Sequence, residues 1–394
     1  MVPKGWMLLQ VSDICKLQNG NSFKPHEWDT KGLPIIRIQN LNGSGNYNYF
    51  SGVPQDKWLV EPGQLLFSWA GTKGVSFGPF IWNGPKGVLN QHIYKVFANE
   101  NVHEHWLYLA LLHITQKIEA QAHGFKSTLL HVQKKDIDNQ FVLTPPVAEQ
   151  KKISQILSTW NKAISVTEKL LANSQQQKKG VIQELLSGKK RLLDENGVRF
   201  SGEWCTCTLS EVAHIIMGSS PKSEAYNDNG LGLPLIQGNA DIKCRVSCPR
   251  VYTSDITKEC TPGDILLSVR APVGTVALSQ HKACIGRGIS AIKSKRKMSQ
   301  SFLYQWFLWF EPKWCYLSQG STFESINSDD IKTLKLSVPN FEEQQKIAAV
   351  LSAADTEIST LEKKLACLKN EKKALMQQLL TGKRRVKVDE AVAV

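Results

Sequence analysis

Three histidines stand close together in the sequence and could suggest a metal site. They are His103, His105 and His113. No carboxylate or cysteine accompanies them in a matching ligand pattern, and metal sites built on imidazole usually have such partners. The alternative, histidines on the surface or on one face of a helix, is therefore favoured, and we expect no metal site.

The cysteines also fail to form a recognisable framework. The chain has nine, an odd number, and seven of them lie between Cys205 and Cys315. The pair Cys205/Cys207 is too tightly spaced for zinc, and the pair Cys244/Cys248 has no second pair to complete a site. Reduced thiols in a cytoplasmic protein fit this distribution better than disulfides.

Two short motifs resemble parts of nucleotide-handling sites, but each lacks an essential element. An amino-methyltransferase needs Asn/Asp-Pro-Pro-Tyr/Phe to hold its target amine. The nearest match, at 144–147, reads Thr-Pro-Pro-Val, and we interpret its prolines as a stop before a helix. Segment 124–128, Gly-Phe-Lys-Ser-Thr, ends like a phosphate loop but lacks the glycine spacing. We expect no catalytic residue and no cofactor in this chain.

The charge of the chain favours a binding function. Lysine and arginine exceed aspartate and glutamate by 13 over 394 residues, and the isoelectric point is about 9.2. Such an excess indicates a polyanionic partner, most commonly nucleic acid, although a basic protein without such a partner is the alternative. No window reaches the ~18 consecutive apolar residues of a membrane span, and the start lacks the apolar stretch of a secretory signal.

Side chains suited to reading bases stand beside the ends of predicted strands. Arginine and lysine recognise guanine in the major groove, and asparagine and glutamine recognise adenine. For each candidate, ordinary surface solvation is the alternative. The candidates are Arg37, Gln39, Asn40, Lys73, Asn90, Gln91, His92 and Lys126 in the first half, and Lys222, Gln237, Asn239, Arg270 and Arg287 in the second.

The elements that must position these residues are written twice. Segments 149–158 and 343–352 share Glu-Gln-x-x-Ile-x-x-x-Leu-Ser, and segments 185–191 and 379–385 share Leu-Leu-[Ser/Thr]-Gly-Lys-[Lys/Arg]-Arg. Segments 62–68 and 262–268 share Pro-Gly-[Gln/Asp]-[Leu/Ile]-Leu-x-Ser. So many matches in the same order establish an internal repeat.

Each copy begins with a globular part, 1–146 in the first and 189–340 in the second, where 189–200 serves as a linker. Short apolar runs bounded by Pro-Gly turns indicate short strands, and helices are expected near 106–121 and 301–310. The fold class predicted for these parts is α+β.

Each copy ends in a long helix, 147–188 and 341–383, and a basic tail follows at 384–394. Apolar residues recur at alternating spacings of four and three, the period of a coiled coil. Thr167, Ser174 and Lys178 interrupt the seam of the first helix. The predicted seam is Ile153, Leu157, Trp160, Ile164, Leu171, Val181, Leu185, Ile347, Leu351, Ala354, Ile358, Leu361, Leu365, Leu368, Leu375 and Leu379.

The two helices most simply pack on each other. The second globular part follows closely on the first helix, so the shortest return of the second helix gives an antiparallel pair with pseudo-two-fold symmetry. Pairing of each helix with another molecule is the alternative. The basic runs after Gly188 and Gly382 favour the negative end of a helix dipole, and contact with phosphate or a partner explains them equally well.

Two dissimilar globular domains that alternate with two closely related long helices form an organisation that resembles the specificity (S) subunits of type I restriction–modification systems. The resemblance rests on the repeated motifs above and on Pro3-Lys4-Gly5-Trp6 and Phe200-Ser201-Gly202-Glu203-Trp204 at the domain starts, and it covers essentially the whole chain.

The resemblance implies that each globular part is a target recognition domain for one half of a bipartite, interrupted DNA sequence. It also implies that the helices act as a spacer and dock two methyltransferase (M) subunits, which restriction (R) subunits join. The partners would use S-adenosylmethionine, ATP and Mg²⁺, and this chain would have no catalytic centre. A recognition subunit for a fused methyltransferase–nuclease, or a coiled-coil scaffold that does not bind DNA, is the alternative.

Overall fold

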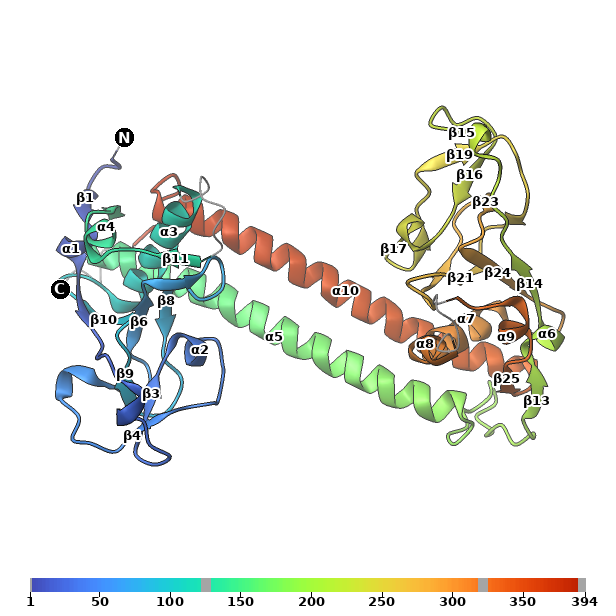
Figure 1. Cartoon of the computed structure of the whole chain (residues 1–394), viewed down its shortest axis with the longest axis horizontal. Helices are drawn as coiled ribbons and strands as arrows, with labels where there is room; N and C mark the ends of the chain where they lie inside the picture. The colour runs from blue at the N-terminus through green and yellow to red at the C-terminus, as the bar shows by residue number, and fades with distance from the viewer. Residues whose placement is uncertain (1, 122–128, 318–324, 389–394) are drawn as a thin grey trace. The chain divides into compact units, whose positions relative to one another are not determined.

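The computed structural model describes residues 2–121, 129–317 and 325–388, which form two compact units. Unit 1 comprises Met1–Thr167 together with Lys364–Val394, and unit 2 comprises Glu168–Lys363. Helices α5 (Val147–Leu186) and α10 (Phe341–Leu380) each begin in one unit and end in the other. Each unit therefore contains one globular domain and a segment of each long helix (Figure 1).

The domain of unit 1 is built on two four-stranded sheets, ordered β2-β10-β6-β8 and β4-β3-β9-β5. Two small sheets, β1-β12 and β7-β11, complete it. Its elements in chain order are β1 (Met7–Gln10), α1 (Val11–Ile14), β2 (Cys15–Asn19), η1 (Pro25–Glu27), β3 (Leu33–Ile36), α2 (Ile38–Leu41), β4 (Tyr49–Phe50), η2 (Asp56–Trp58), β5 (Leu59–Val60), β6 (Leu65–Ser68), β7 (Ala70–Thr72), β8 (Gly78–Ile81), β9 (Gly87–Leu89), β10 (Ile93–Ala98), α3 (Glu104–Gln121), β11 (Leu129–His131), α4 (Lys134–Asp138) and β12 (Phe141–Thr144).

The domain of unit 2 repeats this plan with a six-stranded sheet, β14-β24-β21-β22-β18-β17, and a five-stranded sheet, β15-β19-β16-β23-β20. A small sheet pairs β13 with β25. Its elements are β13 (Cys205–Thr208), α6 (Leu209–Val212), β14 (Ala213–Met217), η4 (Ser223–Ala225), β15 (Tyr226–Asn227), β16 (Leu233–Ile236), η5 (Asn239–Asp241), β17 (Ile242–Lys243), β18 (Val246–Ser247), β19 (Val251–Thr253), β20 (Glu259–Cys260), β21 (Ile265–Ser268), β22 (Val276–Leu278), β23 (Ala283–Ile285), β24 (Ile289–Ser294), α7 (Gln300–Phe310), η6 (Glu311–Lys313), α8 (Trp314–Leu317), α9 (Ser328–Lys332) and β25 (Lys335–Val338).

The main core of each domain lies between one helix and one sheet, which is β2-β10-β6-β8 in unit 1 and the six-stranded sheet in unit 2. In unit 1, Trp106, Leu107 and Leu111 of α3 are fully buried together with Phe67 of β6. In unit 2, Phe302 and Phe307 of α7 are buried with Leu267 of β21 and with Trp314. The apolar runs predicted as strands are central strands, since all four residues of β6 and of β21 are buried. The α+β prediction is confirmed.

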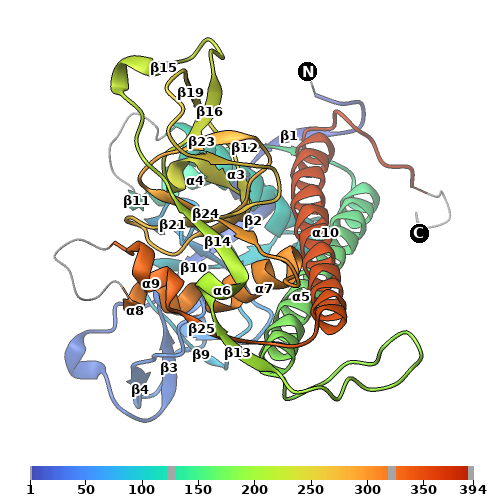
Figure 2. The ribbon, with the colours of Figure 1, turned by 90° about the vertical axis from the view of Figure 1, so that its right-hand side faces the viewer.

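The long helices pack side by side and run in opposite directions within each unit (Figure 2). In unit 1, Ile153 and Leu157 near the start of α5 share a core with Leu379 near the end of α10. In unit 2, Leu185 near the end of α5 shares a core with Leu351 near the start of α10. Every predicted seam residue is buried or half-buried.

Two of the three polar seam positions of α5 have polar partners on α10. The Ser174 hydroxyl donates to Oε1 of Glu357 over 3.0 Å, and Lys178 forms an ion pair with Asp355. Thr167 is buried, and its hydroxyl donates back to the carbonyl of Ala163. Each of these polar side chains therefore has a hydrogen-bond or ion-pair partner, and the equivalent positions in the repeat of α10 are Leu361, Leu368 and Lys372.

Proline and glycine set the helix ends. Helix α5 starts at Val147, directly after Pro146, as the helix-stop interpretation predicts, because proline cannot donate to a preceding turn. Just beyond each helix, Gly188 and Gly382 have φ of +69° and +67°. Glycine adopts this left-handed conformation without the strain that a Cβ atom imposes.

Candidate nucleic-acid interface

Four segments of the chain meet in unit 1, and backbone hydrogen bonds hold them together. The amide of Asn90, in the β9–β10 turn, donates to the carbonyl of Ile36 at the end of β3 over 3.0 Å. The amide of Trp69 donates to the carbonyl of His92 over 3.2 Å, and the amide of Val132, after β11, donates to the carbonyl of Trp69 over 2.9 Å. We call residues 37, 69–70, 90–92 and 131 the loop cluster of unit 1.

Unit 2 builds the same frame with equivalent bonds. Gly286 donates to the carbonyl of Ile236 over 2.8 Å, Val269 to that of Gly288 over 2.9 Å, and Ile326 to that of Val269 over 3.0 Å. The loop cluster of unit 2 is therefore residues 237, 269–270, 286–288 and 325. The two clusters share one backbone arrangement, so their side chains can be compared position by position.

The side chains at equivalent positions differ in type. Three such pairs are Arg37 and Gln237, Ala70 and Arg270, and Gln91 and Arg287. Gln237, Arg270 and Arg287 are exposed, whereas Arg37 is half-buried and its guanidinium lies 5.1 Å from the ring of Trp28. The two frames thus present different sets of donors and acceptors.

Glycine is required at one point of the unit 2 frame. A Cβ atom at Gly288 would lie 2.3 Å from the carbonyl oxygen of Gln237, a contact that backbone cannot relieve without moving. The two segments therefore approach more closely than any other residue would allow there.

Of the sequence-predicted candidates, Arg37, Asn90, Gln91 and His92 meet in the cluster of unit 1, and Gln237, Arg270 and Arg287 meet in that of unit 2. The others lie elsewhere. Lys73 donates to the carbonyl of Glu119 over 2.6 Å, and Gln39 donates to the carbonyl of Asn46 over 3.2 Å. Lys222 is exposed and Asn239 opens η5, while Lys126 lies outside the described residues.

Asn40 is not available to read a base, which corrects one candidate. It is 5% exposed, and its Oδ1 accepts a hydrogen bond from the amide of Arg37 over 2.9 Å. Its Nδ2 donates to the carbonyls of Ser44 and Asn46. Asp241 has the same role in unit 2, where it accepts from the amide of Gln237 over 2.9 Å. Both side chains close the loop from inside.

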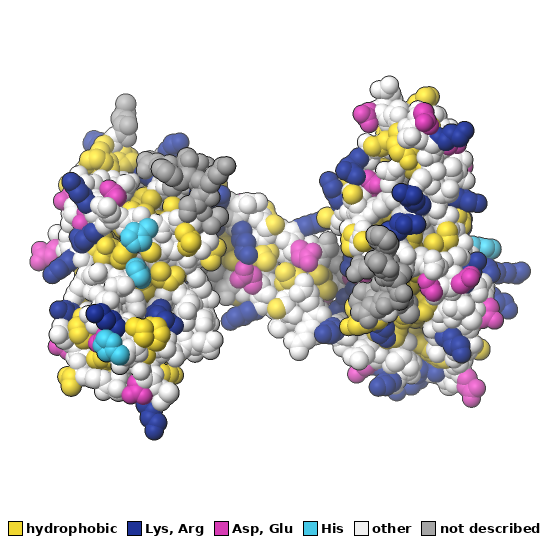
Figure 3. All heavy atoms as spheres, viewed as in Figure 1, with side chains coloured by type: hydrophobic (Ala, Val, Ile, Leu, Met, Phe, Trp, Pro, Cys, Tyr) yellow, Lys and Arg dark blue, Asp and Glu magenta, His cyan; other side chains and the backbone are white. Residues whose placement is uncertain are grey.

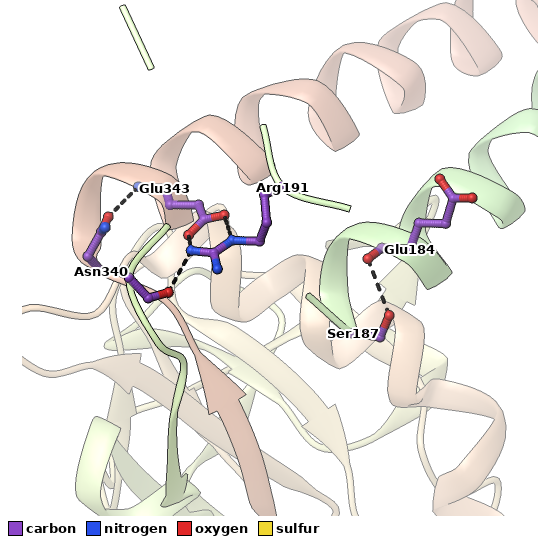
Figure 4. A network of polar contacts seen from close by, with 6 residues as sticks. Glu184, Ser187, Arg191, Asn340 and Glu343 are labelled. Carbon is purple, nitrogen blue, oxygen red and sulfur yellow. Dashed lines mark hydrogen bonds and ion pairs between the residues drawn. The ribbon is translucent and has the colours of Figure 1, made fainter. Parts of the chain in front are cut away.

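Figure 3 shows lysine and arginine side chains distributed over the visible face of both units. Among the basic residues after the helices, Arg191 and Arg385 have structural partners, which corrects the expectation of phosphate contact or dipole complementarity for these two. The guanidinium of Arg191 donates from Nε and Nη2 to the two carboxylate oxygens of Glu343, over 2.6 and 2.7 Å (Figure 4). Glu343 is completely buried, and Arg191 Nη2 also donates to the carbonyl of Gly202.

Unit 1 contains the equivalent ion pair, between the start of α5 and the segment that follows α10. Arg385 donates to both carboxylate oxygens of Glu149, over 3.0 and 2.6 Å, and to the carbonyl of Lys4. The indole of Trp6 donates to the same carboxylate over 3.2 Å. We call Arg191–Glu343 and Arg385–Glu149 the two latches, since each joins the start of one long helix to the segment after the other. The hydrogen bonds to glutamate raise the pKa of both arginines.

The glutamine that follows each latch glutamate joins the same helix to the globular domain. Gln150 accepts from the amide of His103 over 2.8 Å and donates to the carbonyl of Pro145. Gln344 accepts from the amide of Ser299 over 2.8 Å and donates to the carbonyl of Pro339. The repeated Glu-Gln motif and the last arginine of each basic run are thus structural.

Within the described residues, no three His, Cys, Asp or Glu side chains are placed to hold a metal ion. Burial lowers the pKa of His103, His105 and His113, so these imidazoles are neutral at pH 7. Burial raises the pKa of the Cys15 thiol to about 12, and it is free, as are Cys205, Cys207, Cys244, Cys248, Cys260, Cys284 and Cys367. None of the helices described is long and apolar enough to cross a bilayer.

Two α+β domains with one loop frame but different exposed side chains, joined through antiparallel helices, define a class of two-domain recognition proteins. Residues 3–173 and 201–370 each match the type I restriction modification DNA specificity domain. The chain belongs to the family of type I restriction–modification specificity subunits. Its role in such an enzyme is DNA specificity, and the subunit is itself non-catalytic. The family assignment also excludes the scaffold alternative.

Relatives and solved structures agree over nearly the full length. The chain is 32% identical to the MjaX type I specificity subunit of Methanocaldococcus jannaschii, covering 98% of this chain and 95% of the relative. It is 23% identical to the EcoBI specificity subunit of Escherichia coli over 87% of this chain and 77% of the relative. The fold is shared with the S subunit of M. genitalium, at a TM-score of 0.62, 16% identity and 96% of each chain.

A second solved structure shares the fold over 96% of this chain and 98% of its own, with 21% identity and a TM-score of 0.61. It comes from work on the assembly and conformational transition of a type I restriction–modification system.

Proposed function

We propose that each globular domain reads one half of a bipartite, asymmetric DNA target through its loop cluster. Two methyltransferase subunits dock on the long helices, and restriction subunits join that core. S-adenosylmethionine, ATP and Mg²⁺ belong to those partners. The complex works in the cytoplasm, where its double-stranded substrate is found.

One observation supports this proposal above the others: the same backbone frame carries different side chains in the two units. A frame that is held constant positions side chains reproducibly, and a changed set of donors and acceptors selects different base edges. Unit 2 has two exposed guanidinium groups, those of Arg270 and Arg287, that unit 1 lacks. The equivalent residues in unit 1 are Ala70 and Gln91. The two half-sites should therefore differ in sequence.

Replacing Arg270 and Arg287 with alanine tests this assignment. We expect each substitution to relax one base position in one half-site and to weaken cognate binding by roughly 5- to 100-fold, since one good base contact discriminates by about 1–3 kcal/mol. The other half-site should keep its sequence. Selection from a random double-stranded library, with the methyltransferase partner present, measures both. Arg296, a basic residue of unit 2 outside the cluster, is the control position.

Simultaneous change in both half-sites would contradict the proposal, because it would indicate loss of folding or of general affinity rather than of one base contact. If neither variant changes either half-site, Arg270 and Arg287 do not contact bases.

The helices are proposed to fix the number of unread base pairs between the half-sites. Each long helix has 40 residues, or about 60 Å at ~1.5 Å per residue. One turn of DNA is about 34–36 Å, and two readers on one face of the duplex are expected roughly one turn apart, a distance that helices of this length can span.

Insertion of four residues into each helix, which adds about 6 Å to each, tests the spacing. The preferred gap should grow by one or two base pairs, and methylation mapping on a plasmid library of graded gaps measures it. The inserts should be placed opposite each other so that seam pairing is preserved. A gap that stays the same length in the lengthened protein would refute the spacer proposal.

A further inference from the structure

An aromatic and imidazole cluster in unit 1 has no counterpart in unit 2. Trp69, which precedes β7, contacts the ring of His131 at 4.6 Å between centroids in an edge arrangement, and the ring of His92 at 5.1 Å. The two imidazole centroids are 6.5 Å apart. The equivalent positions in unit 2 are Val269, Gly288 and Ser325.

The cluster stands on a rigid base. Trp69 stacks on Tyr94, a buried residue of β10, with the rings 6.0 Å apart and 27° from parallel. Its indole Nε1 donates to the carbonyl of Gln91 over 3.1 Å. His131 is held by the pairing of β11 with β7, in which it lies opposite Ala70. The stacking on Tyr94 and the hydrogen bond to Gln91 therefore fix the indole of Trp69, which can position both imidazoles.

The imidazoles are left open to an external group. His131 is exposed and His92 is half-buried, and neither ring forms a hydrogen bond with any residue in the described ranges 2–121, 129–317 and 325–388. Burial lowers the pKa of His92, and the nearby His131 lowers it further. His92 is thus neutral at pH 7, with one N–H donor and one acceptor nitrogen.

The frame does not need these rings in order to fold. Unit 2 closes the same backbone bonds with valine, glycine and serine, and Val269 is 2% exposed there. Unit 1 has three rings at positions where unit 2 has small or aliphatic side chains. These positions lie in the loop cluster, where we propose that each domain reads its half-site. The glycine at 288 has the packing reason given above, so the differences that indicate a specificity determinant are those at Trp69 and His131.

We propose that His92 and His131, positioned by Trp69, read a guanine in the half-site of unit 1. Guanine is the base whose major-groove edge presents two adjacent acceptors, N7 and O6. Two neighbouring imidazoles can each supply one N–H donor to that pair. This inference rests on the proposed function and names one contact within it.

Binding-site selection with the full chain and its methyltransferase partner tests the contact. His92→Ala and His131→Ala should each make one guanine position of one half-site degenerate and weaken cognate binding by roughly 5- to 100-fold. Trp69→Val, which introduces the residue of unit 2, should relax the same position. His26→Ala, an exposed histidine of η1 in the same unit, should select the wild-type sequence.

The other half-site is an internal check on folding and should be unchanged in all four variants. If both histidine variants select the wild-type bases with wild-type strength, or if the relaxed position is not guanine, the inference is overturned. If wild type itself selects no bipartite motif, the proposed function fails instead. Arg37→Ala separates the two cases, because it should alter the unit 1 half-site even when the histidine variants do not.

Discussion

Replacing Arg191 with alanine should destabilise unit 2 by about 3–5 kcal/mol, the cost of removing one partner from a buried ion pair. The carboxylate of Glu343 is completely buried, and Arg191 pairs with it through two charged hydrogen bonds. Without the guanidinium, the buried carboxylate loses its ion-pair partner and has no water to replace it, which costs free energy of folding.

Native-state hydrogen exchange of the α10 amides in unit 2 measures this loss. Exchange there should accelerate by about 10²- to 10⁴-fold, while unit 1 amides provide an internal reference. Lys190→Ala, at an exposed neighbouring side chain, is the matched control and should change exchange little. An Arg191→Ala protein with wild-type exchange rates would show that the latch does not stabilise unit 2.

The second latch should be weaker. The Arg385 side chain is 41% exposed and that of Glu149 is 11% exposed, against 19% and 0% in the Arg191–Glu343 pair. Solvent screens the more exposed pair, so Arg385→Ala should cost less than Arg191→Ala.

DNA affinity should fall by roughly 10³-fold or more when salt rises from 50 to 200 mM, provided that six or more phosphates are contacted. The physical reason is the release of condensed counterions when lysine and arginine neutralise phosphates. The net charge of +13 and the distribution of basic side chains over both units in Figure 3 supply enough cations for such contacts.

Titration of fluorescent cognate DNA at graded salt concentrations gives the slope of log affinity against log salt. Lys222→Ala, at an exposed lysine outside the loop cluster, should reduce the slope by about one if Lys222 contacts a phosphate, with equal weakening of all sequences. Arg287→Ala should instead alter sequence preference. A slope near zero for wild type would show that binding does not depend on phosphate neutralisation.

Much of the architecture could be predicted because its signals are local in sequence. The four–three spacing of apolar residues depends only on helix geometry, so the α5 and α10 helices and the residues on their buried stripe could be read directly. The repeated Pro-Gly turns and short apolar runs likewise marked the central strands β6 and β21.

The individual side-chain partners could not be read in this way. Asn40 has the type of a base reader, yet its amide closes its own loop, which depends on how residues 37–46 fold. His131 could not be found from the sequence, because it reaches Trp69 only through the pairing of β11 with β7, strands far apart in the chain. Comparing the two copies position by position, at Trp69 and Val269, was the one sequence signal that could have found this cluster.

The duplicated arrangement of domain and helix follows from residue order alone, because a repeat and a helical period are both properties of that order. The role of the repeated charges, in contrast, depends on the folded chain. Arg191 lies 152 residues from Glu343, and the partner of a charged group depends on which segments the fold brings within hydrogen-bond distance. From sequence alone, Arg191 could have bound phosphate or stabilised a helix dipole. In the fold it neutralises the carboxylate of Glu343, which is buried and has no water to stabilise its charge.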